Sequence, residues 1–349
     1  MGKRTRGRAS LSRPTGKGAD KRAGLRLFRP VFALFVMGSD NRSTFNMGPQ
    51  MKRSIIIFTI TIISFIQATP APALSQKSIS AKSAIVMDDA GSVLYAKHPD
   101  ARLAPASTVK LMTAMVALDN LDIQKRVTIS RNAAVVRSIQ PRIRPDEEMT
   151  VTDLLHLALM KSINAAAVAL AEATSGSEQE FVTLMNRKAK ELGANDTLFA
   201  NASGLPKGRE RQYTTASDLV LILRHALTYP LIREILGKKE YLVMTSGGRV
   251  LYLGNTNNLL WQTDNMIGGK TGYTGTARHC FVGAVNTEKG PIFTAVMGAR
   301  SRSSLWKNTL LLTELGIQLE PGYSMDQFRV IPVAAQTMEL EPLTANEGL

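Results

Sequence analysis

The hydrophobic pattern changes its period twice along the chain, and these changes predict the order of strands and helices. Two short apolar and β-branched runs at residues 83–87 and 93–96 flank an Asp-Asp-Ala-Gly segment, which predicts a β-hairpin. From Pro105 the apolar residues fall at helical spacing instead. Further helices are expected at residues 152–160 and 165–173. Another should begin at a capping box formed by Ser177 and Glu180 and end at Gly193, and the next should begin at Thr215 and Asp218 and stop near Pro230.

Strand-like runs return after this helical region. They cover residues 267–273, 281–286 and 292–297, and a Thr-Glu-Lys-Gly turn joins the last two. A helix at about residues 304–315 closes the pattern, and residues 320–349 form a short tail without clear periodicity. Strands at both ends of a helical middle predict an α+β fold, with one antiparallel sheet and helices packed on it.

A secretory signal peptide is predicted at residues 51–73. Met51-Lys52-Arg53 supplies the charged start, residues 55–66 the apolar core, and a small-residue run ending at Ala73 the exit. Cleavage is expected after Ala71 or Ala73, and residues 76–319 are expected to form the catalytic domain. The apolar run is shorter than the roughly 20 residues of a stable membrane span, so no anchor is expected after cleavage.

The formal net charge of +15 comes mostly from the start of the chain. Eleven Lys or Arg residues and two Asp residues give residues 1–50 a net charge of +9, and Lys52 and Arg53 add two more. We interpret residues 1–50 as a doubtful extension from an upstream start; the alternative is a basic arm that binds nucleic acid. An exported protein has no use for such an arm, so no nucleic-acid partner is expected.

The first candidate motif is Ser107-Thr108-Val109-Lys110. On a helix, residues three apart share one face, so the Lys110 amine can reach the Ser107 hydroxyl. A neutral amine can take the proton that makes serine a nucleophile, and the helix start offers free N–H groups to an oxyanion. The motif alone has little weight, because about one or two copies are expected by chance in a chain of this length. Ser304-Leu305-Trp306-Lys307 is a second match.

Two further motifs follow in order. Ser162-Ile163-Asn164 falls between two predicted helices, where a hydroxyl and an amide can point into a cleft. Ser39-Asp40-Asn41 and Ser130-Arg131-Asn132 have the same pattern, but the first lies in the doubtful extension and the second is expected to cap a turn. Lys270-Thr271-Gly272, followed by Tyr273, occurs once and suits the binding of a substrate carboxylate.

This ordered set of three motifs occurs in penicillin-binding proteins and serine β-lactamases. Over about residues 80–319 the chain resembles the low-molecular-mass D-alanyl-D-alanine carboxypeptidases and their endopeptidase relatives. Four further segments carry the resemblance: residues 152–155, 166–172, 201–205 and 254–257. The resemblance implies a fold like that of serine β-lactamases and DD-transpeptidases, in which an antiparallel sheet is flanked by helices beside a helical subdomain.

The resemblance also implies a role for each motif residue. Ser107 is then the acylated nucleophile and Lys110 its proton acceptor. Ser162 and Asn164 relay protons and hold the substrate amide, while Lys270 and Thr271 bind the substrate. Gly272 and Tyr273 complete the substrate-binding strand, and the backbone N–H groups of Ser107 and Tyr273 form the oxyanion hole. Either Arg300 or Arg302 would hold the terminal carboxylate.

The implied partners are peptidoglycan stem peptides, with β-lactam antibiotics as covalent inhibitors, in the periplasm or another extracytoplasmic space. We expect a serine D-Ala-D-Ala carboxypeptidase, with a DD-endopeptidase as the alternative, then a β-lactamase or a non-catalytic wall-binding protein. Neither a metal nor a cofactor is expected, because no pair of the four histidines has zinc spacing. Three positions depart from the family pattern: Ile163, Ala165 and Arg278. His279 beside Cys280 is expected to be packing rather than a catalytic dyad.

Overall fold

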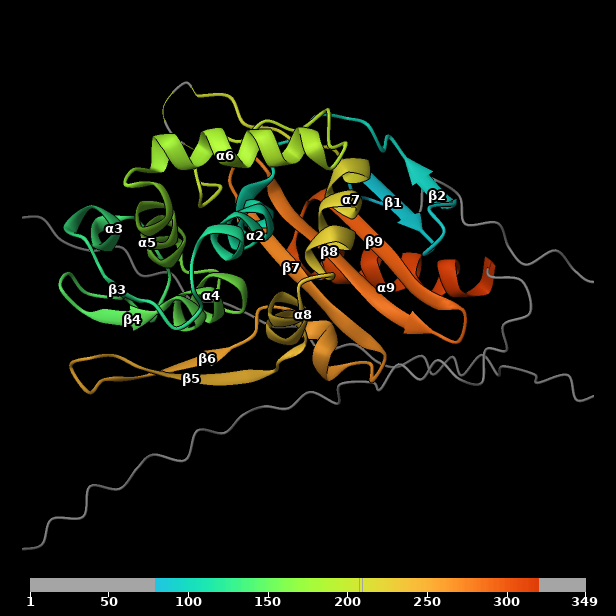
Figure 1. Cartoon of the computed structure of the whole chain (residues 1–349). Coiled ribbons are helices and arrows are strands. Elements are labelled where there is room, and N and C mark those ends of the chain that lie inside the picture. The colour runs from blue at the N-terminus through green and yellow to red at the C-terminus, as the bar shows by residue number, and fades with distance from the viewer. Residues whose placement is uncertain (1–78, 207, 209, 320–349) are drawn as a thin grey trace, which may run out of the picture. The chain divides into compact units, whose positions relative to one another are not determined.

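A five-stranded antiparallel sheet forms the centre of the fold (Figure 1). The computed structural model describes residues 79–206, 208 and 210–319. The chain divides at Pro70/Ala71 into two units, and every described residue belongs to the second. The strands lie in the order β2-β1-β9-β8-β7. Their bounds are Ser83–Met87 (β1), Val93–Lys97 (β2), Met266–Thr274 (β7), Arg278–Thr287 (β8) and Gly290–Ala299 (β9).

Helices cover both faces of this sheet. Helix α9 (Arg302–Leu319) packs against β1, β2, β8 and β9 on one face. On the other face, α7 (Ala216–Ala226) contacts β1, β8 and β9, and α8 (Pro230–Gly237) contacts β7. Because both faces are covered, β9 is buried from Ile292 to Ala299 without the alternation of a half-exposed strand.

A helical subdomain lies beside the sheet (Figure 1). It contains α2 (Lys110–Asn120), α3 (Arg131–Val135), α4 (Val151–Leu159), α5 (Asn164–Ser175) and α6 (Glu178–Glu191). Helix α5 contacts the other four, and its residues Asn164–Ala171 are all buried. Most of these side chains are alanine, whose small volume lets several helices approach α5 closely. Two small two-stranded sheets flank the subdomain: Arg126–Thr128 with Glu148–Thr150 (β3, β4), and Glu240–Met244 with Val250–Gly254 (β5, β6).

The predicted α+β arrangement is confirmed, including the sheet built from both ends of the chain. β1 pairs antiparallel with β2 and also with β9, which joins the first strand to the last. Two predictions about helix ends were wrong. Pro230 does not stop the α7 helix, which ends at Ala226; it is the first residue of a separate helix, α8. Ser177 accepts the N–H of Glu180, but the reciprocal half of a capping box is absent there among the described contacts.

Three predicted segments lie outside the described residues: the extension at 1–50, the signal peptide at 51–73 and the tail at 320–349. The domain boundaries drawn from the sequence therefore remain predictions. Within the described ranges, no helix is both long enough and apolar enough to span a bilayer.

Candidate active site

Ser107 and Lys110 lie at the start of the first helical segment. Pro105 precedes a single 3-10 turn, η2 (Ala106–Val109), which continues directly into α2. The Nζ atom of Lys110 is 3.0 Å from the Oγ atom of Ser107. Lys110 is completely buried and Ser107 is partly exposed. The hydroxyl is therefore accessible to a ligand, while the amine lies beneath it.

The surroundings of Lys110 favour a neutral amine that acts as a base. Its Nζ lies 2.7 Å from Oδ1 of Asn164 and 2.6 Å from the carbonyl oxygen of Ser203. Burial lowers the pKa of Lys110 well below its usual value, and the charge of Lys270 lowers that pKa further. A neutral amine has two N–H bonds and one lone pair. Because the two carbonyl oxygens can only accept, they take both N–H bonds and leave the lone pair for the Ser107 hydroxyl.

Ser162 lies in the four-residue connection between α4 and α5, and Asn164 follows that connection. Ser162 has a φ of +63°, a left-handed conformation that is uncommon for serine. Its Oγ accepts a hydrogen bond from Nζ of Lys270 at 3.0 Å. Asn164 is the first residue of α5, and its Nδ2 donates to the carbonyl oxygen of Arg137 at 2.7 Å. The second motif therefore touches both lysines, with Asn164 on Lys110 and Ser162 on Lys270.

The third motif lies on β7, which is an edge strand of the sheet. Lys270 is fully buried, and its Nζ also donates to the carbonyl oxygen of Thr271 at 2.9 Å. The hydroxyls of Thr271 and Thr256 are 2.7 Å apart. Tyr273 is 62 % exposed at the end of the same strand. An edge strand has one row of backbone groups free of strand partners, so a peptide can add alongside it.

Two glycines make room for the segment that carries Ser107. A Cβ atom on Gly272 would lie 3.1 Å from the backbone nitrogen of Ser107. A Cβ on Gly204 would lie 1.9 Å from the carbonyl oxygen of Ala106, and Gly204 itself has a φ of +81°. Ala106 also has a positive φ, of +49°. The missing side chains therefore let the backbone of Ser107 lie directly against β7 and against the loop at residues 201–204.

A cavity of about 520 Å³ opens over these residues. Of the eight residues predicted from the sequence, six line it: Ser107, Ser162, Asn164, Thr271, Gly272 and Tyr273. The other two, Lys110 and Lys270, lie buried beneath it and make the hydrogen bonds described above. Of the two arginines proposed from the sequence to hold the terminal carboxylate, Arg302 lines the cavity and Arg300 does not.

The duplicate motifs lie elsewhere. Ser304 bonds with Ser301 at the start of α9, and Lys307 is exposed. Ser130 caps α3 by accepting the N–H of Ala133. Neither serine borders the cavity.

His279 and Cys280 are not a catalytic dyad. Cys280 is fully buried, and burial raises the pKa of its thiol to about 11, so it stays protonated at neutral pH. His279, its neighbour on β8, instead lines the cavity, and its ring centroid lies 4.4 Å from that of Tyr273.

Several residues of the site were not predicted from the sequence. Asn201 organises the loop that supports Lys110: its Oδ1 accepts the N–H of Ser203 at 3.2 Å and that of Gly204 at 2.7 Å. Thr256 bonds to Met160 next to the second motif. Arg137 and Trp306 line the cavity from distant parts of the chain. Residues 201–205 and 254–257 are among the segments that carry the family resemblance, but the contacts of Asn201 and Thr256 depend on the folded loops.

The described residues contain no group of three or more His, Cys, Asp and Glu side chains able to hold a metal ion.

Residues 69–301 match the model of the D-alanyl-D-alanine carboxypeptidase family, peptidase family S11. The chain belongs to this family. The resemblance inferred from the motifs is thereby confirmed, and so is the assignment to the serine peptidases. The S11 match begins before the first described residue and ends just before α9.

Curated relatives include both carboxypeptidases and endopeptidases. D-alanyl-D-alanine carboxypeptidase DacF of Bacillus subtilis is 38 % identical over 231 residues, which are 64 % of this chain and 59 % of that protein. A D-alanyl-D-alanine endopeptidase of Pseudomonas aeruginosa is 32 % identical over 295 residues, which are 82 % of this chain and 92 % of that protein. The chain thus spans little more than half the length of the first relative.

A solved structure supports the fold. The D-alanyl-D-alanine carboxypeptidase of Mycobacterium tuberculosis superposes with a TM-score of 0.66 and 32 % identity, over 72 % of this chain and 95 % of that one. The prediction of a DD-peptidase-like fold is confirmed.

The backbone conformation of Arg278 predicts a gain of stability on replacement by glycine. Its φ is +60°, and a left-handed residue other than glycine costs about 1 kcal/mol. We expect Arg278→Gly to raise the free energy of unfolding, measured by urea denaturation, by about 1 kcal/mol. Arg278→Ala keeps the Cβ atom and should give no gain. An equal gain in both variants would show that the arginine side chain, not the backbone, causes the difference.

The buried Lys270 predicts a pH-dependent stability. Burial lowers its pKa to about 7, whereas an unfolded lysine titrates near pH 10.4. Between these values the unfolded state binds a proton that the folded state does not, so stability rises with pH through this window. The slope from Lys270 should be about 1.4 kcal/mol per pH unit. The free energy of unfolding is measured in urea at several pH values from 8 to 10. Its increase per pH unit should be smaller by that amount in Lys270→Met and unchanged in the exposed control Lys307→Met.

This pKa also qualifies the view of Lys270 as a permanent cation. In the empty site Lys270 is divided between its charged and neutral forms near pH 7. A bound carboxylate favours the charged form of a neighbouring amine. Lys270 is thus expected to be fully charged only when an anionic substrate is present.

Proposed function

We propose that this S11 chain removes the terminal D-alanine from peptidoglycan stem peptides through an acyl-enzyme. The observation that carries the proposal is the position of the Lys110 amine, 3.0 Å from the Ser107 hydroxyl and held by two carbonyl oxygens. This arrangement provides a nucleophile and a base, and the adjoining edge strand provides a place for a peptide.

In the acylation step, the Lys110 amine takes the proton of Ser107 as Oγ attacks the carbonyl carbon of the penultimate D-alanine. The tetrahedral oxyanion is expected to accept the backbone N–H groups of Ser107 and Tyr273. As the C–N bond breaks, the proton now on Lys110 passes to the leaving amine, for which Ser162 is the expected relay. Free D-alanine leaves, and the remaining peptide is an ester of Ser107.

In the deacylation step, Lys110 takes a proton from a water molecule that attacks the ester carbonyl. The Ser107–acyl bond then breaks and Ser107 regains its proton. Lys270 in its charged form, Thr271 and Arg302 are proposed to hold the substrate carboxylate during acylation, because that carboxylate leaves with the free D-alanine. Asn164 is proposed to hold the substrate amide beside its contact with Lys110.

Cleavage of crosslinks by the same residues is the second candidate. The observation that favours it is the similarity to the endopeptidase of Pseudomonas aeruginosa, which is 32 % identical to this chain over 295 residues.

One assay separates the two candidates. Purified protein is incubated with a pentapeptide monomer and with a crosslinked peptide dimer, and the products are weighed by mass spectrometry. Loss of one D-alanine from the monomer supports the carboxypeptidase, whereas conversion of the dimer into two monomers supports the endopeptidase. Absence of both products would refute the proposed function.

Export is a further part of the proposal, because peptidoglycan lies outside the cytoplasm. We expect the mature protein to begin between Ala71 and Gln76, since the small-residue run there follows the apolar core. N-terminal sequencing of protein recovered from outside the cytoplasm measures this directly. A mature protein that retains residues 1–50 would contradict both the signal peptide and the upstream-start interpretation.

A further inference from the structure

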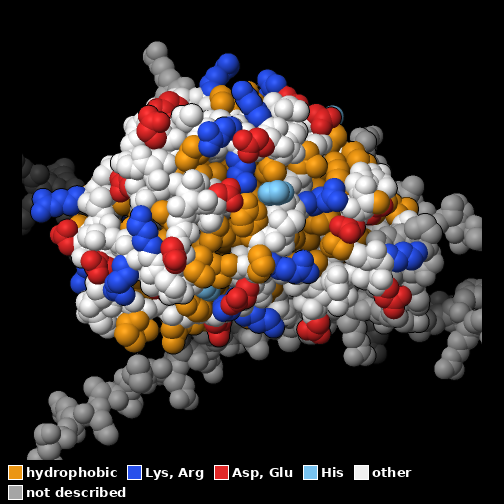
Figure 2. All heavy atoms as spheres, in the orientation of Figure 1, with side chains coloured by type: hydrophobic (Ala, Val, Ile, Leu, Met, Phe, Trp, Pro, Cys, Tyr) orange, Lys and Arg blue, Asp and Glu red, His pale blue; other side chains and the backbone are white. Residues whose placement is uncertain are grey.

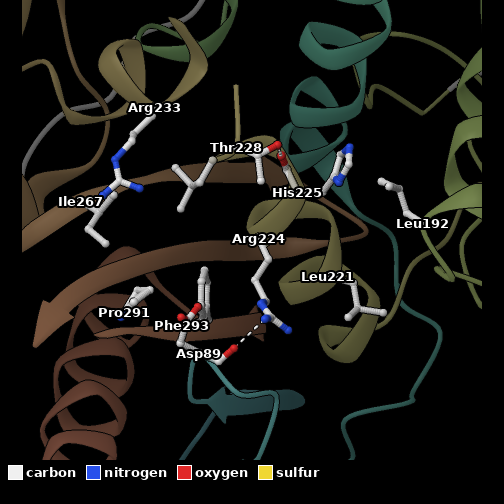
Figure 3. Close-up of a pocket in the computed structure, with 11 residues that line it drawn as sticks. Asp89, Leu192, Leu221, Arg224, His225, Thr228, Arg233, Ile267, Pro291 and Phe293 are labelled. Carbon is white, nitrogen blue, oxygen red and sulfur yellow. Dashed lines mark hydrogen bonds between the residues drawn. The ribbon is translucent and has the colours of Figure 1, made fainter. Parts of the chain in front are cut away.

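A second pocket, also of about 520 Å³, lies away from the catalytic cavity (Figure 3). It is bounded by α7 and α8, by the β1–β2 turn, and by the ends of β7 and β9 that are remote from Ser107. Ile267 borders this pocket and Tyr273 borders the catalytic cavity, six residues further along β7. At about 3.3 Å per residue the two sites are about 20 Å apart along the strand.

Two guanidinium groups from different helices line this distal pocket. Arg224 on α7 donates through Nη2 to the carbonyl oxygen of Asp89 at 2.6 Å, and its guanidinium carbon lies 5.6 Å from the ring centroid of Phe293. These contacts hold Arg224 in place, and Figure 3 shows its bond to Asp89. Arg233 on α8 has no ion pair or side-chain hydrogen bond within the described part of the chain. The pocket is therefore bordered by Arg224, which is held by protein contacts, and by Arg233, whose guanidinium has no such partner among the described residues.

The remaining walls are largely apolar. Their side chains come from α7, from the residues directly after α6 and α7, and from β7 and β9: Leu192, Leu221, Leu227, Ile267, Pro291 and Phe293. Figure 2 shows apolar side chains gathered on this face with Lys and Arg side chains among them. A bare inorganic anion would leave such walls unused, whereas an anion on an aliphatic stem would contact both parts.

The neighbouring charges leave the arginines available to a ligand. Glu234, next to Arg233, is held by Nζ of Lys238 at 2.7 Å. Asp89 is the acidic residue of the lining, and Arg224 bonds to its backbone oxygen. His225 adds no charge near pH 7, because burial lowers its pKa and the charge of Lys188 lowers it further. The positive charge of the pocket is thus that of its two arginines, set against the single carboxylate of Asp89 in the lining.

We propose that the distal pocket binds a carboxylate carried on an aliphatic stem, as presented by a second peptide strand of a polymeric substrate. The identity of that strand rests on the proposed function, whereas the carboxylate class rests on the pocket alone. Bound at both sites, a polymer would be held while Ser107 acts on one of its peptide ends. A short soluble peptide would occupy only the catalytic cavity.

Direct binding tests the ligand class without requiring activity. The full chain is titrated with N-acetylglutamate and the arginine Nε–H signals are followed by NMR. We expect the signals of Arg224 and Arg233 to shift, and the Kd to rise about tenfold in Arg233→Gln. Arg126→Gln, which removes an exposed arginine of β3 from outside both pockets, should leave the Kd unchanged. An unchanged Kd in Arg233→Gln, or tighter binding of inorganic phosphate at the same signals, would overturn the proposal.

Kinetics then test the role of the pocket. We expect Arg233→Gln to raise the KM for polymeric peptidoglycan about tenfold and to leave the KM for a soluble pentapeptide unchanged. Arg224→Gln, which keeps a donor for Asp89, should act in the same direction. Equal losses on both substrates, or none on the polymer, would overturn the role in substrate binding. If the parent cleaves neither substrate, the proposed function fails, and the N-acetylglutamate titration alone decides whether the pocket binds carboxylates.

Discussion

Benzylpenicillin is expected to label the protein at Ser107, and Ser107→Ala is expected to abolish the label. The hydroxyl of Ser107 lies 3.0 Å from the buried amine of Lys110, whose two N–H bonds are directed at carbonyl oxygens, at the foot of the cavity that six of the predicted residues line. A β-lactam resembles the D-Ala-D-Ala end in this family, so it should acylate the same oxygen. Removing the nucleophile should reduce the acylation rate by on the order of a thousandfold or more.

Peptide mapping by mass spectrometry identifies the labelled residue. Ser304→Ala is the matched control, because Ser304 begins the other Ser-x-x-Lys match but bonds to Ser301 on the surface. Its labelling should equal that of the parent. A label on Ser304 or Ser162, or a label that survives Ser107→Ala, would show that the nucleophile has been wrongly assigned.

The two Ser-x-x-Lys matches show what the sequence can and cannot decide. Both place serine and lysine on one helical face, so spacing alone does not distinguish them. What distinguishes Lys110 is complete burial against Asn164 and Ser203, which are 54 and 93 residues away in the chain. The sequence favoured the Ser107 match because the other two motifs follow it in order, not because of its local pattern.

The antiparallel sheet built from both ends of the chain was predictable because strands buried between helices carry long apolar runs. The β5–β6 hairpin was missed for the opposite reason: Leu242, Met244, Val250 and Tyr252 are apolar but more than half exposed. Apolar residues on an outward face break the rule that alternation marks burial. Helix α8 was missed because Pro230 serves equally as a stop signal and as a first helical residue.

The residues that support the catalytic groups could not be found from local pattern. Asn201 acts through a turn in which its side chain accepts two backbone N–H groups, and Arg137 contributes a backbone oxygen to Asn164. Any residue type can supply a backbone oxygen, so Arg137 leaves no signal in the sequence. Likewise Gly204 and Gly272 are common residues, and their role appears only where the Ser107 segment lies against them.

Lys110→Ala is expected to lower the acylation rate by on the order of a thousandfold, because no other group described near Ser107 is placed to take its proton. The parent should lose acylation rate as the pH falls through the pKa of Lys110, since the protonated amine has no lone pair. That pKa lies well below the usual lysine value, because burial and then Lys270 lower it. The rate of the parent should therefore level off before the pH reaches the range of an ordinary lysine.

Lys270→Arg provides the contrast within the same cavity. Arginine keeps a cation but changes its shape and hydration, so acylation should persist with weaker substrate binding. A permanent cation at this position also disfavours protonation of Lys110. The pH at which the acylation rate falls should therefore be no higher in Lys270→Arg than in the parent. Stopped-flow measurement of acylation against pH compares the parent with both variants. If Lys110→Ala acylates at nearly the rate of the parent with the same pH profile, Lys110 is not the base, and the mechanism proposed for Ser107 is wrong.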